Sequence, residues 1–214
     1  MSDKIKKKVE LFFCKYAKLT FSEGAVILRA DQPAPGIFYI KKGLIKQYVI
    51  SDKGAVLTIN IFRPGSFFLM MWAINNTPNS FFFETLEDAE VYRAPLKDTR
   101  EFVKSHPDVL YELTSRILSG LSGIIKRLQF LAFDDADTKL QTLFSYLAKT
   151  YGQKKDDQYS INLPLTHKDI ATWIGTSRET ASFKMEEMRR KGLISYKHHQ
   201  YIVKDLKKLE NTVN

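Results

Sequence analysis

The chain contains very little cysteine, and this scarcity excludes several classes of protein. Cys14 is the one cysteine among 214 residues. A single thiol forms no disulfide within the chain, so a disulfide-stabilised secreted scaffold is excluded and a reducing compartment is expected. An iron–sulfur cluster needs about four thiolate ligands, so it is excluded for the same reason.

Long apolar runs are missing as well. No segment of the sequence approaches the roughly 20 apolar residues that span a bilayer. The N-terminal stretch SDKIKKKVELFF lacks the apolar core and cleavage site of a signal peptide. We therefore expect a cytoplasmic protein with no membrane partner.

Histidine is scarce, which argues against a metal centre. Of the four histidines, His106 stands directly before Pro107 and is interpreted as a helix-entry residue. His167 lies at an expected helix start, while His198 and His199 lie in an expected turn. The sequence also lacks a phosphate-binding glycine loop, a nucleophile elbow and paired metal-binding histidines. We expect no metal, no cofactor and no enzymatic activity.

The strongest pattern that is present lies in residues 165–194, LTHKDIATWIGTSRETASFKMEEMRRKGLI. Thr166 and Asp169 have the three-residue spacing of a capping box, which favours a helix start. Gly175 is expected to end this helix, because glycine readily adopts a positive φ. The buried face of the helix is predicted to consist of Ile170, Ala171 and Ile174.

A second helix is predicted directly after this glycine. Either Thr176 or Ser177 can cap it, and Thr176 also has capping-box spacing with Glu179. Its apolar stripe consists of Ala181, Met185 and Met188. The other face is polar at its N-terminal end, where side chains of a helix in the major groove reach base edges and phosphates.

Two extended runs follow and predict a β-hairpin wing. Leu193 to Tyr196 alternate in polarity, and Tyr201 to Val203 form the second run after a short connection. Residues 176–204 carry seven basic and three acidic side chains in a chain of net charge +9, which suits a polyanionic partner without establishing one. The alternative is a helical hairpin with a solvated charged face. The predicted DNA contacts are Thr166, His167, Ser177, Arg178, Glu179, Ser182, Phe183, Lys184 and Lys197.

A long helix is predicted from about Pro107 to Phe133, and its apolar residues follow a heptad. Such a stripe favours pairing with a second copy of the helix, although packing on its own domain is the alternative. The predicted dimer residues are Leu110, Ile117, Leu121, Ile124, Leu128 and Leu131, with Thr114 at one of the intermediate seam positions. Asp134 and Asp135 then interrupt the pattern, where they can cap a new helix that buries Leu140, Leu143, Phe144 and Leu147. This break is the expected hinge of the chain.

The stretch TSRETASFKMEEMRRKGLIS resembles the DNA-binding domain of the cyclic-AMP receptor and fumarate–nitrate regulator (Crp/Fnr) family of bacterial transcription factors. Upstream, GIFYIKKGLIKQYVISDKGAVLTINIFRPGSFF resembles the effector-binding β-roll of that family, and the resemblance extends from about Leu19 to Leu209. It implies an α+β fold with a cyclic-nucleotide-binding-like β-roll (jelly roll), a parallel dimerisation helix and a C-terminal winged helix-turn-helix. The implied partners are double-stranded DNA with a palindromic operator and a second copy of the chain.

Two further roles follow from the resemblance. Activating family members contact RNA polymerase through a loop that corresponds here to residues 154–158, although a solvated polar turn is the commoner explanation. Members with the Ser-Arg-Glu-Thr core commonly carry an arginine that reaches guanine five positions after the first arginine. Phe183 stands there in this chain, and phenylalanine cannot donate to guanine but can contact a thymine methyl group.

The effector site departs from the family pattern. Cyclic-nucleotide-binding members use a Gly-Glu pair and a later Arg-Ser pair to hold the ribose and the cyclic phosphate, and here Leu69–Met70 and, allowing one deletion, Asn79–Ser80 stand at those places. Burying a phosphate without its cation is costly, so we expect an effector other than a classical cyclic nucleotide. The candidate pocket residues are Arg63, Phe68, Met70, Asn79 and Ser80. The many aromatic and methionine residues nearby more often belong to a hydrophobic core than line a ligand pocket. The alternative is that they bind an apolar effector.

We therefore predict three parts: an effector-sensing β-roll in residues 1–106, a dimerisation helix in residues 107–133 and a winged helix-turn-helix in residues 134–214. The predicted function is sequence-specific DNA binding as a homodimeric transcription regulator with an unidentified small-molecule effector. The alternative is a ligand-binding β-roll that acts through protein partners and whose DNA binding is vestigial. Binding to duplex DNA that depends on salt concentration distinguishes the two.

Overall fold

The computed structural model describes residues 2–133, 135–197 and 200–211, without the side chains of residues 126, 130, 131, 133 and 211. The chain folds into two compact units. Unit 1 consists of residues 1–51 and 58–123, and unit 2 consists of residues 52–57 and 124–214. The long helix α4 (Pro107–Phe133) contributes residues to both units.

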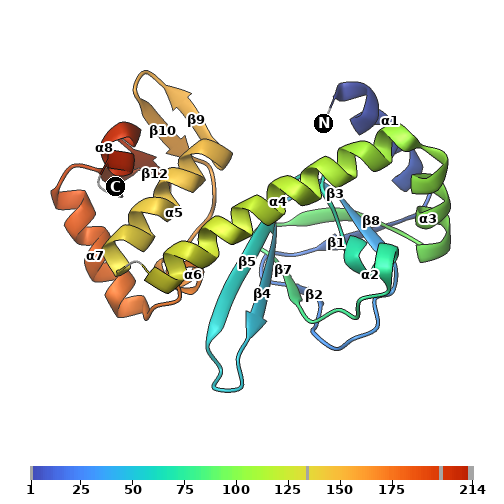
Figure 1. Cartoon of the computed structure of the whole chain (residues 1–214), viewed down its shortest axis with the longest axis horizontal. Coiled ribbons are helices and arrows are strands. Elements are labelled where there is room, and N and C mark those ends of the chain that lie inside the picture. Colours follow the sequence, from blue (N-terminus) through green and yellow to red (C-terminus); the bar gives the residue numbers. More distant parts are fainter. Residues whose placement is uncertain (1, 134, 198–199, 212–214) are drawn as a thin grey trace. The chain divides into compact units, whose positions relative to one another are not determined.

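Unit 1 is built on two antiparallel sheets (Figure 1). The first has the order β1 (Ala17–Phe21), β8 (Ala89–Ala94), β3 (Ile37–Lys42) and β6 (Phe67–Phe68). The second has the order β2 (Val26–Leu28), β7 (Phe82–Thr85), β4 (Ile45–Ile50) and β5 (Val56–Phe62). The two sheets of the N-terminal half, which precede the long helix, confirm the predicted β-roll.

The core of unit 1 is aromatic on both faces of β3. Phe38 stacks on Phe68 with ring centroids 5.1 Å apart, and Phe68 stacks in turn on Phe83 at 4.7 Å. Because successive side chains of a strand point to opposite faces, Tyr39 lies on the other side, where its ring is 5.3 Å from that of Phe13. Ile37 to Ile40 are all buried, so the central strand is covered on both faces.

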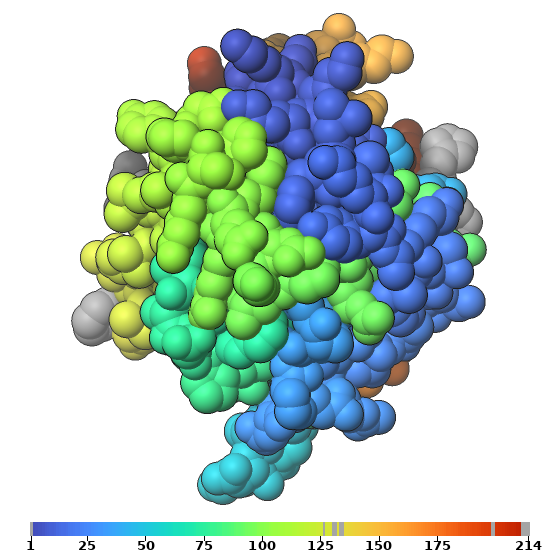
Figure 2. Space-filling model, turned by 90° about the vertical axis from the view of Figure 1, so that its right-hand side faces the viewer, coloured from blue at the N-terminus to red at the C-terminus, as the bar shows by residue number. Residues whose placement is uncertain are grey.

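Besides the first part of α4, unit 1 contains the helices α1 (Asp3–Phe13), α2 (Met70–Asn75) and α3 (Leu96–Ser105). Figure 2 shows α1, in dark blue, beside α3 on one face of the molecule, and the rings of Phe12 and Phe102 stack there at 4.1 Å. Lys8 of α1 also forms an ion pair with Asp108 at the start of α4. The first turns of α4 are held to the unit through Val109 and Leu113, which are buried.

Unit 2 combines helices with a small antiparallel sheet. Helix α5 (Ala136–Tyr151) begins at Asp135, whose carboxylate accepts a hydrogen bond from the Thr138 amide at 2.8 Å, as the sequence predicted. The four predicted residues Leu140, Leu143, Phe144 and Leu147 are buried. The other residue predicted at this junction, Asp134, lies outside the described residues. The sheet has the order β11 (Ile194–Lys197), β12 (Gln200–Val203), β10 (Gln158–Ile161) and β9 (Gly152–Lys155).

Among the described helices, none is both long enough and apolar enough to cross a membrane.

Removing one aromatic ring from the core of unit 1 should strongly lower its free energy of unfolding. Phe68→Ala leaves a cavity among rings that stack on it, so we expect unit 1 to lose about 3–5 kcal/mol of stability. Urea denaturation followed by circular dichroism measures this loss. The control is Met71→Ala in the same region, whose side chain is exposed and whose loss should change stability by less than about 0.5 kcal/mol. Equal effects of the two substitutions would contradict the packed interior.

Candidate nucleic-acid interface

Helix α6 (His167–Ile174) begins with the predicted capping box. The Thr166 amide donates to the Asp169 carboxylate at 3.0 Å, and the Asp169 amide donates to the Thr166 hydroxyl at 3.2 Å. The helix ends at Gly175, whose φ of 68° lies in the left-handed region that glycine tolerates. Ile170, Ala171 and Ile174 are buried as predicted, and Trp173 joins them.

Helix α7 (Arg178–Arg190) begins at Ser177, so the structure decides between the two possible caps. The Ser177 hydroxyl accepts a hydrogen bond from the Thr180 amide at 3.1 Å. Thr176 instead belongs to the turn, where its amide donates to the Ala171 carbonyl at 3.1 Å. A capping box between Thr176 and Glu179 is therefore not formed, because Thr180 occupies the third position of the helix.

The two faces of α7 differ as predicted. Ala181, Met185 and Met188 are buried and hold the helix against its own unit. Arg178 is exposed in the first turn, Glu179 and Phe183 lie on the opposite face, and the Phe183 side chain is 58% exposed. A large apolar side chain exposed beside charged residues on a helix is typical of a surface that contacts a partner.

Lys184 lies differently from its neighbours on α7. Its ammonium is 2.9 Å from the carboxylate of Asp137 at the start of α5 and 2.9 Å from that of Glu187. Hydrogen bonds to these two carboxylates raise the pKa of Lys184 to about 12. The ion pairs direct the charge toward α5, so Lys184 holds α7 in place on α5.

Two of the predicted residues are brought together across the turn. A ring nitrogen of His167, at the start of α6, is 2.8 Å from the hydroxyl of Ser182 on α7. This hydrogen bond joins the N-terminal end of one helix to the polar edge of the other. Thr166 and His167 are exposed, as are Arg178 and Glu179 at the start of α7. The N-terminal end of α6 and the exposed side chains of α7 therefore form one polar surface.

The predicted wing is confirmed as the antiparallel pair β11 and β12. Leu193, Ile194, Tyr201 and Val203 are buried and anchor it to unit 2. Lys197 is exposed at the end of β11, whereas His198 and His199 lie outside the described residues. The hairpin adds to β10 through the pairing of Ile161 with Tyr201, which extends the sheet beyond the wing.

Sequence reasoning missed the contacts that hold this surface in place. Asp137 is 47 residues from Lys184, and no local spacing signals that pair. Glu187 lies three residues after Lys184, a helical spacing that does favour an ion pair. Arg127 of α4 was also missed: it donates to the Trp173 carbonyl of α6 at 2.6 Å and lies 5.7 Å from the Trp173 ring.

The candidate effector residues of unit 1 do not gather into one polar site. Phe68 and Met70 are buried in the core cluster, and Phe68 lies within the aromatic stack. The buried Asn79 side chain donates to the carbonyls of Arg29 at 3.0 Å and Phe81 at 2.8 Å. Its amide nitrogen thus fastens two loops together. Arg63 and Ser80 are exposed.

The backbone at the family's Gly-Glu position keeps a glycine-like conformation. Leu69 has a φ of 71°, in the left-handed region that is unfavourable for a branched side chain. Its side chain is nevertheless buried in the core with Phe68 and Met70. The turn before α2 is therefore filled with apolar groups.

This arrangement predicts a negative result with cyclic AMP. Met70 replaces the glutamate that holds ribose, and the Asn79 amide is occupied by two carbonyls. At ~100 μM, cyclic AMP should raise the melting temperature by less than about 1 °C, because stabilisation follows RT ln(1 + [L]/Kd). Differential scanning fluorimetry measures the shift, with a palindromic duplex as a positive control for ligand stabilisation. A saturable cyclic-AMP shift of several degrees would contradict this prediction.

No group of three or more potential metal-ligating side chains occurs in the part of the chain that the structure describes.

Comparisons with known proteins agree with this architecture. Residues 18–106 match the family model of the cyclic nucleotide-binding domain, and residues 140–212 match that of the Crp-like helix-turn-helix domain. The global nitrogen regulator of Synechocystis sp. is 26% identical over 182 residues, which cover 82% of this chain and 79% of that protein. The transcriptional regulator SdrP of Thermus thermophilus is 25% identical over 194 residues, or 90% of this chain and 92% of that protein.

A solved structure supports the fold. A mutant of CooA from Carboxydothermus hydrogenoformans superposes with a TM-score of 0.81 at 19% identity, covering 94% of this chain and 89% of that chain. The two relatives named above are a global nitrogen regulator and a transcriptional regulator, in agreement with the expectation that this chain is not an enzyme. Because both family models match in the same order as the two halves of the fold, the chain belongs to the Crp/Fnr family of DNA-binding transcription regulators.

Proposed function

We propose that the chain acts as a homodimer whose two α7 helices read the half-sites of a palindromic operator. The observation that carries this proposal is the exposed first half of α7, where Arg178, Glu179 and Phe183 project from a helix that is capped by Ser177 and fixed by its buried stripe. A helix held in this way loses little conformational entropy when it enters the major groove.

The three exposed residues differ in what they can recognise. Arg178 pairs with guanine or with phosphate, and Glu179 accepts a hydrogen bond from a cytosine amino group. Phe183 gains by burying its exposed ring against a thymine methyl group. Thr166, His167 and the wing residue Lys197 serve as phosphate contacts that set the register of the protein on the duplex.

Lys184 has a different role in this proposal. Its ammonium pairs with Asp137 and Glu187, so it supports the angle of α7 on α5 and contributes little to direct phosphate binding. The exposed turn between β9 and β10, residues 154–158, is the candidate contact with RNA polymerase.

The dimer interface is assigned to α4. Five of the predicted seam residues are between 42% and 66% exposed in the single chain: Leu110, Ile117, Leu121, Ile124 and Leu128. The sixth, Leu131, has a side chain outside the described residues. A continuous apolar stripe of this length on one helix is buried by pairing with a second copy, as in a parallel coiled coil.

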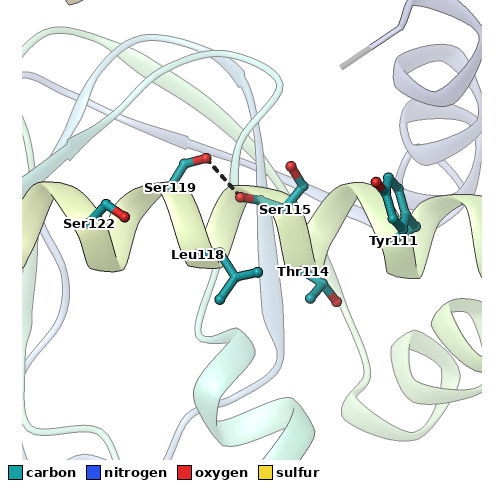
Figure 3. A pocket seen from close by; sticks show the side chains of 6 residues that line it. All are labelled: Tyr111, Thr114, Ser115, Leu118, Ser119 and Ser122. Atoms are coloured by element: carbon teal, nitrogen blue, oxygen red, sulfur yellow. Dashed lines mark hydrogen bonds between the residues drawn. The ribbon is translucent and has the colours of Figure 1, made fainter.

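A second group of exposed residues extends this surface. Figure 3 shows Thr114 and Leu118 projecting from the same side of α4 within a shallow hollow that Tyr111 and three serines also line. Tyr111 and Leu118 are themselves exposed apolar side chains. The exposed apolar surface of α4 therefore reaches beyond the seam at Tyr111 and Leu118. The three serines lie further around the helix, on the side away from the seam.

Regulation is proposed to act by a shift in population. An effector that binds one arrangement of the two units better than another changes the fraction of dimers whose recognition helices fit both half-sites. The aromatic interior of unit 1 and its occupied Asn79 amide favour an effector other than a cyclic nucleotide.

The dimer is tested by placing charge in the seam. Ile124→Glu brings two unpaired carboxylates together at the seam, where burying them is costly. Analytical ultracentrifugation should then show a monomer with the circular dichroism spectrum of the parent. Ser119→Glu is the matched control, because Ser119 lies on the opposite side of α4 and should leave the dimer intact. A dimeric Ile124→Glu variant would show that the seam is assigned wrongly.

Base reading is tested by selection from a randomised duplex library. Glu179→Ala should relax the preference at one base pair of each half-site, since such a contact discriminates by about 1–3 kcal/mol. Phe183→Arg should move the selected half-site toward guanine, because an arginine there can reach the guanine O6 and N7 atoms. Both variants keep the buried stripe of α7 and should fold like the parent.

The selected duplex, the parent protein and the two variants also distinguish DNA recognition from the alternative function. Binding to the selected duplex should weaken linearly on a log–log scale as salt increases, because phosphate contacts release counterions. Identical selected sequences for the parent and both variants would mean that α7 does not read bases. Failure to select any duplex would favour a ligand-binding protein that acts through protein partners.

A further inference from the structure

Two of the ten glycines in the chain have no local reason to be glycine. Seven glycines have a φ between +68° and +153°, and Gly152 packs so closely on the Ala148 carbonyl that a Cβ would lie 2.2 Å from it. Gly120 and Gly123 lie inside α4, where a Cβ on either would meet nothing within 4 Å in the described part of the chain. Glycine within a helix is strongly unfavourable relative to alanine.

A second copy of the chain does not account for Gly123. With about 100° per residue in an α-helix, Gly123 lies about 140° around α4 from the centre of the proposed seam and Gly120 about 80°. Close approach of a partner helix favours small residues at the contact itself. Gly123 is on the far side of that contact.

The glycines belong instead to another stripe of α4. Residues three or four apart on a helix share a face, and this stripe runs through Val109, Leu113, Gly120, Gly123 and Arg127. Val109 and Leu113 are buried in unit 1. Arg127 is held in unit 2, and between these two ends the stripe passes first through Arg116 and then through the two residues that lack a side chain.

The Arg127 contact attaches the last turns of α4 to the DNA-binding helices. Its guanidinium donates to the Trp173 carbonyl at 2.6 Å and lies 5.7 Å from the indole ring, within reach of a cation–π interaction. Burial lowers the pKa of Arg127 to about 10. The junction at Asp135 therefore lies within unit 2, because α5, α6 and the end of α4 belong to the same compact unit.

We propose that α4 bends between Gly120 and Gly123, and that the residues after Gly123 move with the DNA-binding unit as one body, clamped by Arg127 on Trp173. The bend occurs where two glycines weaken the helix and where a side chain would meet nothing in the described part of the chain. This places the hinge before the Asp134–Asp135 junction that the sequence suggests. The proposal concerns motion within one chain and does not depend on the operator or on the identity of an effector.

The hinge is tested by measuring distances between the units in the full-length protein. One nitroxide label is attached to Cys14, which is exposed in unit 1, and the other to a cysteine introduced by Lys154→Cys, an exposed position of β9 in unit 2. Labelled chains are diluted with unlabelled chains, so that electron–electron double resonance reports distances within one chain. The width of the distance distribution reports bending.

Gly120→Ala with Gly123→Ala should narrow that distribution. Each substitution should lower the bent population about fivefold, which is equivalent to about 1 kcal/mol. The matched control is Ser119→Ala with Ser122→Ala, which changes two exposed residues in the same turns and should keep the parental width. Equal widths for the two double variants would overturn the proposal. Dissociation of the glycine variant in ultracentrifugation, with unchanged width, would assign the glycines to the dimer contact instead.

The clamp is tested separately by amide hydrogen exchange. Arg127→Met keeps an unbranched apolar stem but removes the guanidinium, so residues 124–129 should exchange several-fold faster while residues 109–116 keep the parental rates. Equal protection of residues 124–129 in the parent and the variant would show that Arg127 does not hold this segment to unit 2.

Discussion

The continuity of α4 is the constraint on which the other features of the molecule depend. A helix of 27 residues repeats its faces every 3.6 residues, so each stripe of side chains runs along its whole length. One stripe packs on unit 1 at its start and on unit 2 near its end, through Leu113 and Arg127. Another carries the exposed leucines and isoleucines of the proposed dimer seam. Because the backbone joins the two stripes rigidly, a change in one contact is transmitted to the other unless the helix bends.

The aromatic interior of unit 1 limits the effectors that the protein can accept. Phe38, Phe68 and Phe83 stack on one another within the roll, and Asn79 uses its amide to hold two loops. A filled apolar interior stabilises the roll through burial, and burying a phosphate among such side chains without a cation is costly. This interior is the basis of the proposal that the effector is not a cyclic nucleotide.

The proposed DNA-binding surface depends on contacts that lie behind it. Ala181, Met185 and Met188 fix one side of α7, while Lys184 links the helix to Asp137 on α5. These contacts allow Phe183 to remain exposed on the other side without loss of a defined orientation. Preorganisation of this kind favours sequence discrimination, because a mismatched base cannot be accommodated by a shift of the helix.

Much of unit 2 could be predicted from the sequence because its signals are local. The capping box of Thr166 and Asp169, the left-handed Gly175 and the buried stripe of α7 each depend on residues within about two helical turns of one another. The order of strands, long helix and winged helix-turn-helix followed from the same periodicities and from the family resemblance. The choice between Thr176 and Ser177 as the cap did not, since both have suitable side chains and the turn geometry selects one.

Tertiary structure decided what depends on distant residues. The pairing of Lys184 with Asp137, the clamp of Arg127 on Trp173 and the stacking of Phe68 between two other strands join positions far apart in the chain. Sequence periodicity states which face of an element is buried, but not which other element covers it. For that reason the sequence by itself determined the helices, the wing and the family, and the fold decided which side chains anchor the reading helix and which fill the roll.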